Sequence, residues 1–240
     1  MGNYLNPDIS TFARVVNSEI YVDKTGLIEY TNRSAKTLQS YICISRPRRF
    51  GKSIAANMLS AYYTCEYDSR ELFSNFKIAS SDSYEKHLNK YDVIFLNMQE
   101  FLSQSSNVEE MLSLLKKSVI WDLLDKYPDF RYFDETNLMR TLQDIYNKTK
   151  RPFVVIIDEW DCIFREYITD KKAQEKYLDF LRDLFERQRI CRTCLYDRNS
   201  SNKKYGTHSA LNMFDEFSMI DPGPLAEYVG FTEEEVSELV

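Results

Sequence analysis

Three short apolar runs in the chain predict buried β-strands. They cover residues 41–45, 92–98 and 153–157, and the last, Phe-Val-Val-Ile-Ile, is the most strand-like run of the sequence. Runs of this kind are typical of parallel strands that are covered on both faces, because side chains of both orientations are then buried. Between and after these runs, apolar residues recur at helical spacing. This spacing predicts helices over about 52–65, 107–126, 138–146 and 171–187.

Strands that alternate with helices predict an α/β fold, with a mostly parallel sheet covered by helices on both faces. A length of 240 residues suits a single domain of this class. In such sheets, ligands bind at the carboxyl ends of the strands. Ligand-binding or catalytic residues are therefore expected directly after 41–45 and 153–157.

Composition excludes some functions. A net charge of −6 gives no overall basic field, so nucleic-acid binding is not indicated. No run of 18 apolar residues is present, so no membrane span is expected, and the N-terminus lacks the pattern of a signal peptide. Five scattered cysteines then favour a reduced, cytoplasmic protein. Cys191 and Cys194 resemble half a zinc site, but no second pair accompanies them.

The segment after 41–45 predicts a loop that binds the phosphates of ATP. It reads Arg46, Pro47, Arg48, Arg49, Phe50, Gly51, Lys52, Ser53. The usual motif, G-x-x-x-x-G-K-[ST], is met at its end, while Arg46 stands in place of the first glycine. Backbone N–H groups of such a loop and helix bind phosphate; Lys52 is expected to reach the β- and γ-phosphates, and the Ser53 hydroxyl to bind Mg²⁺. The alternative is a basic turn that caps a helix.

The run 153–157 ends in Asp158-Glu159, which predicts two carboxylates at the tip of a strand. Asp158 is expected to hold Mg²⁺ through water, and Glu159 to polarise an attacking water as the catalytic base. The alternative is an ordinary strand end with solvated acids, although two such motifs in this order favour the functional interpretation. Asp161 either orients the basic loop residues or is a solvated surface acid.

Five strings together resemble the AAA-ATPase-like domain proteins of bacteria. They are Tyr21–Thr25, Ser45–Ser53, Val154–Asp161, Tyr205–Asn212 and Glu227–Glu235. That family itself uses Arg in place of the first glycine of the loop. The resemblance implies a P-loop NTPase fold, ATP and Mg²⁺ as ligands, and ATP hydrolysis. It also implies that the strand after Asp158-Glu159 inserts between the two strands that carry the motifs.

Many members of this family continue into a nuclease-like module of the PD-(D/E)XK type. The resemblance therefore predicts that the chain is truncated at Val240 and lacks that module. It leaves a homo-oligomer or another protein as the expected partner. Arg182 and Arg187 are eligible as an arginine finger supplied to a neighbouring subunit.

Residues 186–204 depart from the family pattern where the inserted strand is expected. They are basic and polar, whereas a central parallel strand is normally apolar. A compensated frameshift is one explanation, because one choice of codons, read in the neighbouring frame, gives a family-like strand. A polar segment that occupies or vacates the middle of the sheet predicts a weakly stable domain with impaired hydrolysis.

Three functions remain open at this stage. The first is an ATP-binding AAA-like domain whose relatives hydrolyse ATP. The second is a nucleotide-responsive interaction module that binds ATP without turnover, and the third is a phosphotransferase, for which no acceptor site is visible. Two shorter segments carry weaker predictions: Tyr21–Thr25 either lines the nucleotide side or serves folding, and Thr232 with Glu235 predicts a capping box at a helix start.

Overall fold

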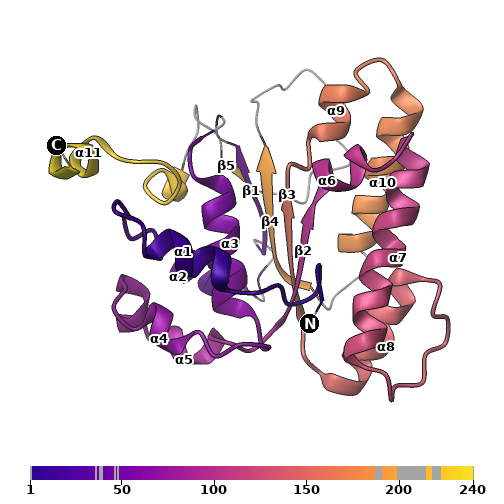
Figure 1. The fold of residues 1–240 in the computed structure, drawn as a ribbon, viewed down its shortest axis with the longest axis horizontal. Helices are drawn as coiled ribbons and strands as arrows, with labels where there is room; N and C mark the ends of the chain where they lie inside the picture. Colours follow the sequence, from indigo (N-terminus) through magenta and orange to yellow (C-terminus); the bar gives the residue numbers. More distant parts are fainter. Residues whose placement is uncertain are drawn as a thin grey trace.

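A computed structural model describes residues 2–35, 37, 40–45, 47, 49–186, 191–198, 215–217 and 223–239. Its centre is a five-stranded sheet in the order β2-β3-β4-β1-β5, with parallel pairing between all neighbours (Figure 1). The strands are β1 (Tyr41–Ser45), β2 (Asp92–Asn97), β3 (Phe153–Asp158), β4 (Cys191–Arg198) and β5 (Asp215–Phe217). The three strands predicted from apolar runs are confirmed, and β2 ends one residue early because Met98 begins a helix.

The strand β4 lies between β3 and β1, as the family resemblance implied. Its Leu195 is the register partner of both Ile156 in β3 and Ile42 in β1. The polar segment therefore occupies the slot between the two motif-bearing strands and does not vacate it. Backbone pairing needs no apolar side chain, and only the backbone of β4 is described, while residues 187–190 and 199–204 lie outside the described residues.

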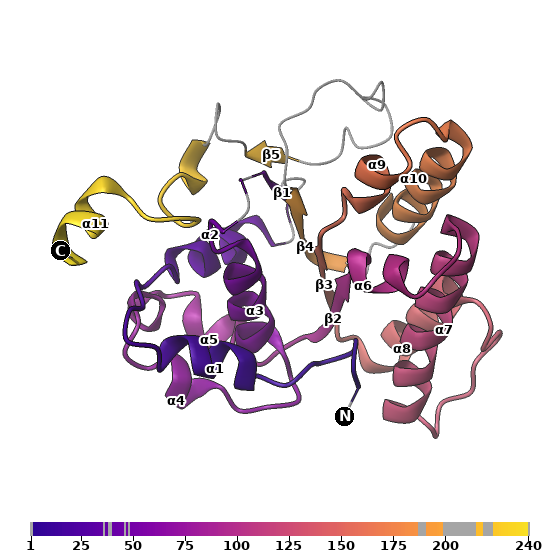
Figure 2. The same cartoon turned by 45° about the horizontal axis from the view of Figure 1, so that its top comes forward.

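Helices cover both faces of the sheet, which confirms the predicted fold class. One face carries α1 (Ser10–Val16), α2 (Gly26–Ser34), α3 (Lys52–Tyr63), α4 (Arg70–Phe73) and α5 (Tyr84–His87). The other carries α6 (Met98–Ser103), α7 (Val108–Lys126), α8 (Leu138–Thr149), α9 (Cys162–Glu166) and α10 (Lys171–Glu186). Figure 2 shows the same division from a second direction, with α11 (Glu233–Leu239) beyond α2.

Alternate residues of the strands feed two hydrophobic cores. In β3, Val154 and Ile156 pack with α3, whereas Val155 and Ile157 pack with α6, α7 and α10. All six residues of β3 are buried. This is the physical reason that a continuous apolar run, and not an alternating pattern, marks the strand.

One residue expected in the core does not lie there. The helical pattern grouped Ile54 with Met58, Leu59 and Tyr62, and the last three are almost fully buried. Ile54 is 42% exposed because it lies in the first turn of α3, beyond the ends of the strands, where it lines a pocket.

The segment Tyr21–Thr25 serves folding in the described structure. The Asp23 carboxylate accepts hydrogen bonds from the Thr25 and Lys77 backbone N–H groups at 2.8 and 2.7 Å. Lys24 Nζ donates to the Glu227 carbonyl and forms an ion pair with Glu235, which fastens the C-terminal segment. No residue of this segment is among the described pocket-lining residues.

The predicted capping box at the start of α11 is confirmed. The Thr232 backbone N–H donates to Glu235 Oε2 at 2.7 Å, and the Glu235 N–H donates to Thr232 Oγ1 at 3.2 Å. Across the described part of the chain, none of the helices combines the length and the apolar character that a membrane crossing requires.

Candidate nucleotide-binding site

The loop between β1 and α3 turns through left-handed backbone conformations. Arg49 has φ 70°, and Gly51, which directly precedes α3, has φ 77° and ψ 14°. A side chain at position 51 would be strained whatever space surrounds it, which explains the glycine. The turn directs the N-terminus of the 12-residue helix α3, with its unpaired N–H groups and positive dipole end, toward the loop.

Lys52 begins α3 and is 8% exposed. Its Nζ atom donates a hydrogen bond to the Pro47 carbonyl oxygen at 3.0 Å, so the side chain folds back over the loop. The ammonium group thus lies inside the concave side of the turn. A phosphate chain in this turn would be within its reach.

The two predicted motifs meet at Ser53 and Asp158. Ser53 Oγ donates to Asp158 Oδ2 at 2.9 Å, and the carboxylate, at the last position of β3, is 5% exposed. A hydroxyl and a carboxylate are hard oxygen donors, which is the ligand chemistry that Mg²⁺ prefers. The residues present therefore fit a magnesium ion bound together with nucleotide phosphates.

Glu159 follows directly after β3 in a left-handed conformation, with φ 54°. Its backbone N–H donates to Asp158 Oδ1 at 3.0 Å. A left-handed conformation costs a residue other than glycine on the order of 1–3 kcal/mol, and such residues cluster at functional sites. The strained turn brings the Glu159 side chain into the pocket.

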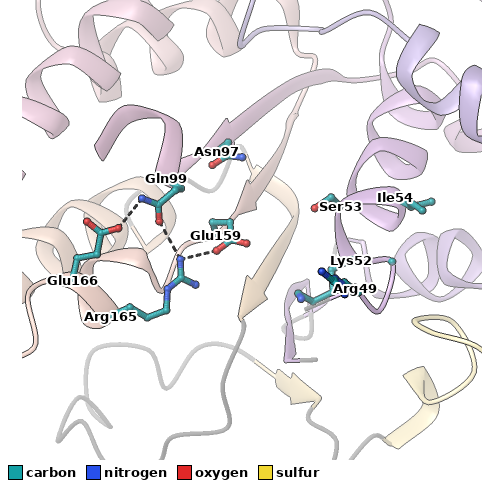
Figure 3. A pocket seen from close by; sticks show the side chains of 10 residues that line it. Arg49, Lys52, Ser53, Ile54, Asn97, Gln99, Glu159, Arg165 and Glu166 are labelled. Carbon is teal, nitrogen blue, oxygen red and sulfur yellow. Dashed lines mark hydrogen bonds and ion pairs between the residues drawn. The ribbon is translucent and has the colours of Figure 1, made fainter. Parts of the chain in front are cut away.

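The pocket has a volume of about 730 Å³, within the usual range for small-molecule sites. Figure 3 shows two facing walls. The loop and α3 contribute one wall, with Arg49, Gly51, Lys52, Ser53 and Ile54. The ends of β2 and β3 and the helices that follow them contribute the other, with Asn97, Gln99, Glu159, Arg165 and Glu166.

Arg165 of α9 organises this second wall. Its Nη2 atom lies 2.7 Å from Glu159 Oε2 and donates to Gln99 Oε1 at 3.1 Å. Its Nη1 atom donates to Asp161 Oδ1 at 2.6 Å. Gln99 Nε2 continues the network to Glu166 Oε1 at 2.7 Å (Figure 3). Burial lowers the pKa of Arg165, but the carboxylates of Asp161 and Glu159 outweigh that effect and raise it.

The structure corrects one interpretation of Asp161. A solvated surface acid is excluded, because Asp161 is 3% exposed. The ion pair that it forms is with Arg165, one helical turn along the chain. Its described role is therefore to hold the guanidinium on the second wall.

Other predicted residues take different places. Arg46 and Arg48 lie outside the described residues, as do Arg187 and the string 205–212. Phe50 is not among the residues that line the pocket; it is 36% exposed, and a Cβ atom added at Gly230 would lie 2.9 Å from its ring. Arg182 forms an ion pair with Asp179 on its own helix, α10.

Five lining residues were not predicted from the sequence as site residues: Ile54, Asn97, Gln99, Arg165 and Glu166. Asn97 is the last residue of β2 and Gln99 lies in α6, which follows directly, and the carboxyl end of β2 lies at the same edge of the sheet as the two motifs. Their placement at the carboxyl end of a predicted strand could therefore have marked both residues as candidates for the site. The side chain of Asn97 also accepts a hydrogen bond from the Glu100 N–H at 3.2 Å and so caps α6.

The sheet order, the loop before α3 and the acidic end of β3 define a P-loop nucleoside triphosphatase fold. A family model described as "Predicted AAA-ATPase" matches residues 8–197. The match covers most of the chain, and the protein belongs to this AAA-ATPase-like family. Membership makes it a nucleotide-binding AAA-like domain.

Solved structures with a similar fold include two larger proteins. The chain is similar to C. elegans PCH-2, with 12% identity and a TM-score of 0.32 over 88% of this chain and 40% of that chain. It is also similar to the ORC2 protein of Aeropyrum pernix, with 14% identity and a TM-score of 0.43 over 94% and 54%. The chain thus spans about half or less of these proteins. No curated protein matches it.

Proposed function

We propose that this chain binds Mg²⁺-ATP in the pocket between the loop before α3 and the ends of β2 and β3. The observation that carries the proposal is the 2.9 Å contact between Ser53 Oγ and Asp158 Oδ2, in the same pocket as Lys52. The contact supports a shared ligand because it brings the hydroxyl after the phosphate loop and the carboxylate of the second motif together beside Lys52.

Each wall has a separate task in this proposal. The backbone N–H groups at the start of α3 and the Lys52 ammonium hold the β- and γ-phosphates, and Arg49 adds positive charge at the rim. A magnesium ion bound at Ser53 and Asp158 supplies charge neutralisation of the phosphates. The wall of Gln99, Glu159 and Arg165 then faces the γ-phosphate.

Glu159 is the residue that we assign to catalysis. Its carboxylate accepts a proton from a water molecule as the water oxygen forms a bond to the γ-phosphorus, and the bond between this phosphorus and the bridging oxygen breaks to leave ADP. Its position directly after Asp158 supports the role, since the base and the metal ligand then lie on adjacent residues at one strand end.

Titration with a fluorescent ATP analogue, with and without Mg²⁺, tests the binding proposal. Lys52→Ala is expected to weaken binding by at least about ten-fold, because it removes a charge-assisted contact to phosphate. Lys172→Ala, at an exposed lysine of α10, is the matched control and leaves the affinity unchanged. Unchanged affinity in Lys52→Ala would remove the proposal.

A second candidate is a module that binds ATP without turning it over. The observation that favours it is the ion pair between Arg165 and Glu159, which engages the proposed base. Release of inorganic phosphate decides between the two: Glu159→Gln abolishes release by an ATPase and changes nothing in a binder. We also propose that turnover is slow in this chain, because the segment 186–204 departs from the family pattern at the central strand.

The origin of that segment is open to a direct test. A compensated frameshift requires particular codons across 186–204, so the nucleotide sequence decides it. A shift of frame back to the family-like strand is then expected to raise both the thermal stability and the rate of phosphate release. Family membership is also compatible with a homo-oligomer, and light scattering with and without ATP measures that state.

A further inference from the structure

The wall that faces the phosphate loop carries two carboxylates and one guanidinium. These are Glu159, Glu166 and Arg165, and they lie opposite Lys52 and Ser53 (Figure 3). In the proposed binding mode, the γ-phosphate is the part of ATP nearest to Glu159. An anionic phosphate beside an uncompensated carboxylate is repelled, and the repulsion is strong in a partly buried site.

Arg165 is placed where it cancels this repulsion. Its Nη2 atom contacts Glu159 Oε2 at 2.7 Å, and its side chain is 24% exposed, which limits screening by water. Among the described lining residues, the other cations, Arg49 and Lys52, belong to the opposite wall. Arg165 is therefore the cation that the described second wall places beside Glu159.

Two further groups fix the guanidinium: Asp161, which is not among the lining residues, and Gln99, which lines the pocket beside it. Asp161, 3% exposed, accepts from Nη1 at 2.6 Å, and Gln99 accepts from Nη2 at 3.1 Å. Three acceptors on two terminal nitrogens match the planar fork of an arginine, and an ammonium cannot reproduce this geometry. Arg165 is therefore held toward Glu159 and is not a mobile surface cation.

We propose that Arg165 is a positioning residue that neutralises Glu159, so that the site accepts the γ-phosphate and prefers nucleoside triphosphates to diphosphates. The inference rests on the proposed binding of ATP in this pocket. It concerns the negative charge of the γ-phosphate, which ATP has and ADP lacks. Since the β-phosphate lies nearer to the loop and Lys52, loss of Arg165 weakens the binding of ATP far more than that of ADP.

The test compares affinities for ADP and for adenylyl imidodiphosphate, an ATP analogue that resists hydrolysis, with Mg²⁺ present. Arg165→Gln is expected to weaken the binding of the analogue by about ten-fold and the binding of ADP by less than about two-fold. In the double variant Arg165→Gln with Glu159→Gln, the affinity for the analogue is expected to return to within about three-fold of the wild-type value, because the carboxylate that Arg165 neutralises is also gone. Glu159→Gln alone completes the cycle.

Two further variants separate charge from folding. Arg165→Lys keeps the charge but loses the planar fork, so its preference for the analogue over ADP is expected to lie between those of the wild type and Arg165→Gln. Arg140→Gln is the matched control, because it removes an arginine with an ion pair to Asp144 of α8, outside the lining residues, and leaves both affinities unchanged.

The outcomes separate this inference from the proposed function. If the wild-type protein binds neither nucleotide, the proposed function fails and the inference fails with it. If the wild type binds both, an unchanged preference in Arg165→Gln overturns the inference alone. A loss that affects both nucleotides equally, or that Glu159→Gln does not restore, assigns Arg165 a structural role and also overturns it.

Discussion

Ser53 Oγ lies 2.9 Å from Asp158 Oδ2, although the two residues are 105 positions apart in the chain. The contact joins the start of α3 to the end of β3. The strand β3 pairs with β4, which pairs in turn with β1, the strand that leads into the loop before α3. The contact therefore depends on the strand order and on the conformation of the loop at the same time.

Replacement of this hydroxyl is expected to remove the effect of Mg²⁺ on nucleotide affinity. In Ser53→Ala, Asp158 keeps its carboxylate but the second oxygen ligand is lost, so ATP affinity measured with Mg²⁺ falls by about ten-fold. The affinity measured with EDTA stays the same. Ser103→Ala, at an exposed hydroxyl of α6, is the control. Equal losses with and without Mg²⁺ would contradict the proposed metal site.

Arg49→Gly is expected to stabilise the fold and weaken binding. Arg49 has φ 70°, which glycine adopts without strain, so the free energy of unfolding rises by up to about 1 kcal/mol. The same change removes a cation from the pocket rim, and ATP affinity falls by about three- to ten-fold. Urea denaturation and nucleotide titration measure the two effects.

Lys150→Gly provides the matched control for Arg49→Gly. Lys150 follows α8 with φ 55° and lies away from the lining residues. A glycine there is expected to stabilise the fold to a similar extent, about 1 kcal/mol, with unchanged ATP affinity. If Lys150→Gly also weakened binding, stiffness of the domain, and not loss of charge, would explain the effect of Arg49→Gly.

The buried carboxylate of Asp92, at the start of β2, is expected to make the stability of the fold depend on pH. It is fully buried, and it accepts hydrogen bonds from Tyr127 at 2.7 Å and from Asn6 at 2.9 Å, with Lys126 at 3.3 Å and Arg151 at 3.6 Å. Burial raises the pKa of Asp92, but these hydrogen bonds and cations outweigh burial and hold it below its ordinary value.

The sign of the pH effect follows from that direction. A lowered pKa means that the unfolded chain binds the proton more readily, so the contribution is complete above about pH 4 and is lost as the pH falls through the lower folded value. Asp92→Asn is expected to cost about 1.5–3 kcal/mol at pH 7 and to flatten the dependence between pH 5 and 3. Asp129→Asn, at an exposed aspartate, is expected to do neither.

Glu235→Gln is expected to release the C-terminal segment. Burial raises the pKa of Glu235, but its contacts with Lys24 and Thr232 outweigh burial and lower the pKa. The carboxylate is therefore charged when it holds α11. Loss of the charge removes about 1 kcal/mol of local stability, and limited proteolysis within 223–239 becomes about five-fold faster. Glu234→Gln, an exposed neighbour, should be cleaved at the wild-type rate.

The strands were predictable because burial on both faces leaves a continuous apolar run. This holds for 41–45 and 153–157, whose described side chains are buried in the two cores, apart from the partly buried Tyr41. β4 had no such signal, and only the family resemblance located it, since its residues are polar while its backbone pairs on both sides. At Ile54 the apolar pattern was misleading. This residue has the helical spacing of a core residue, but it is exposed at the start of α3 and lines the pocket.

The positions of four site residues were predictable because the apolar pattern marks the elements that carry them. Lys52 and Ser53 begin a helix, Asp158 ends a strand, and Glu159 directly follows it. Arg165 was not, because α9 has five residues and too few turns to show a period. Whether its guanidinium turns toward Glu159 depends on Asp161 and Gln99, which only the folded chain brings near. The roles of these residues remain predictions for the experiments above.

The central position of β4 also constrains how the protein acquires its ligand during synthesis. In the described sheet, β1 and β3 are aligned through β4 and not through each other. A nascent chain that ends before Cys191 holds both halves of the site without the strand that pairs with each of them, and only the core around α3 then joins β1 to β3. Because a ligand stabilises only states that bind it, ATP is expected to stabilise such an intermediate less than the complete domain.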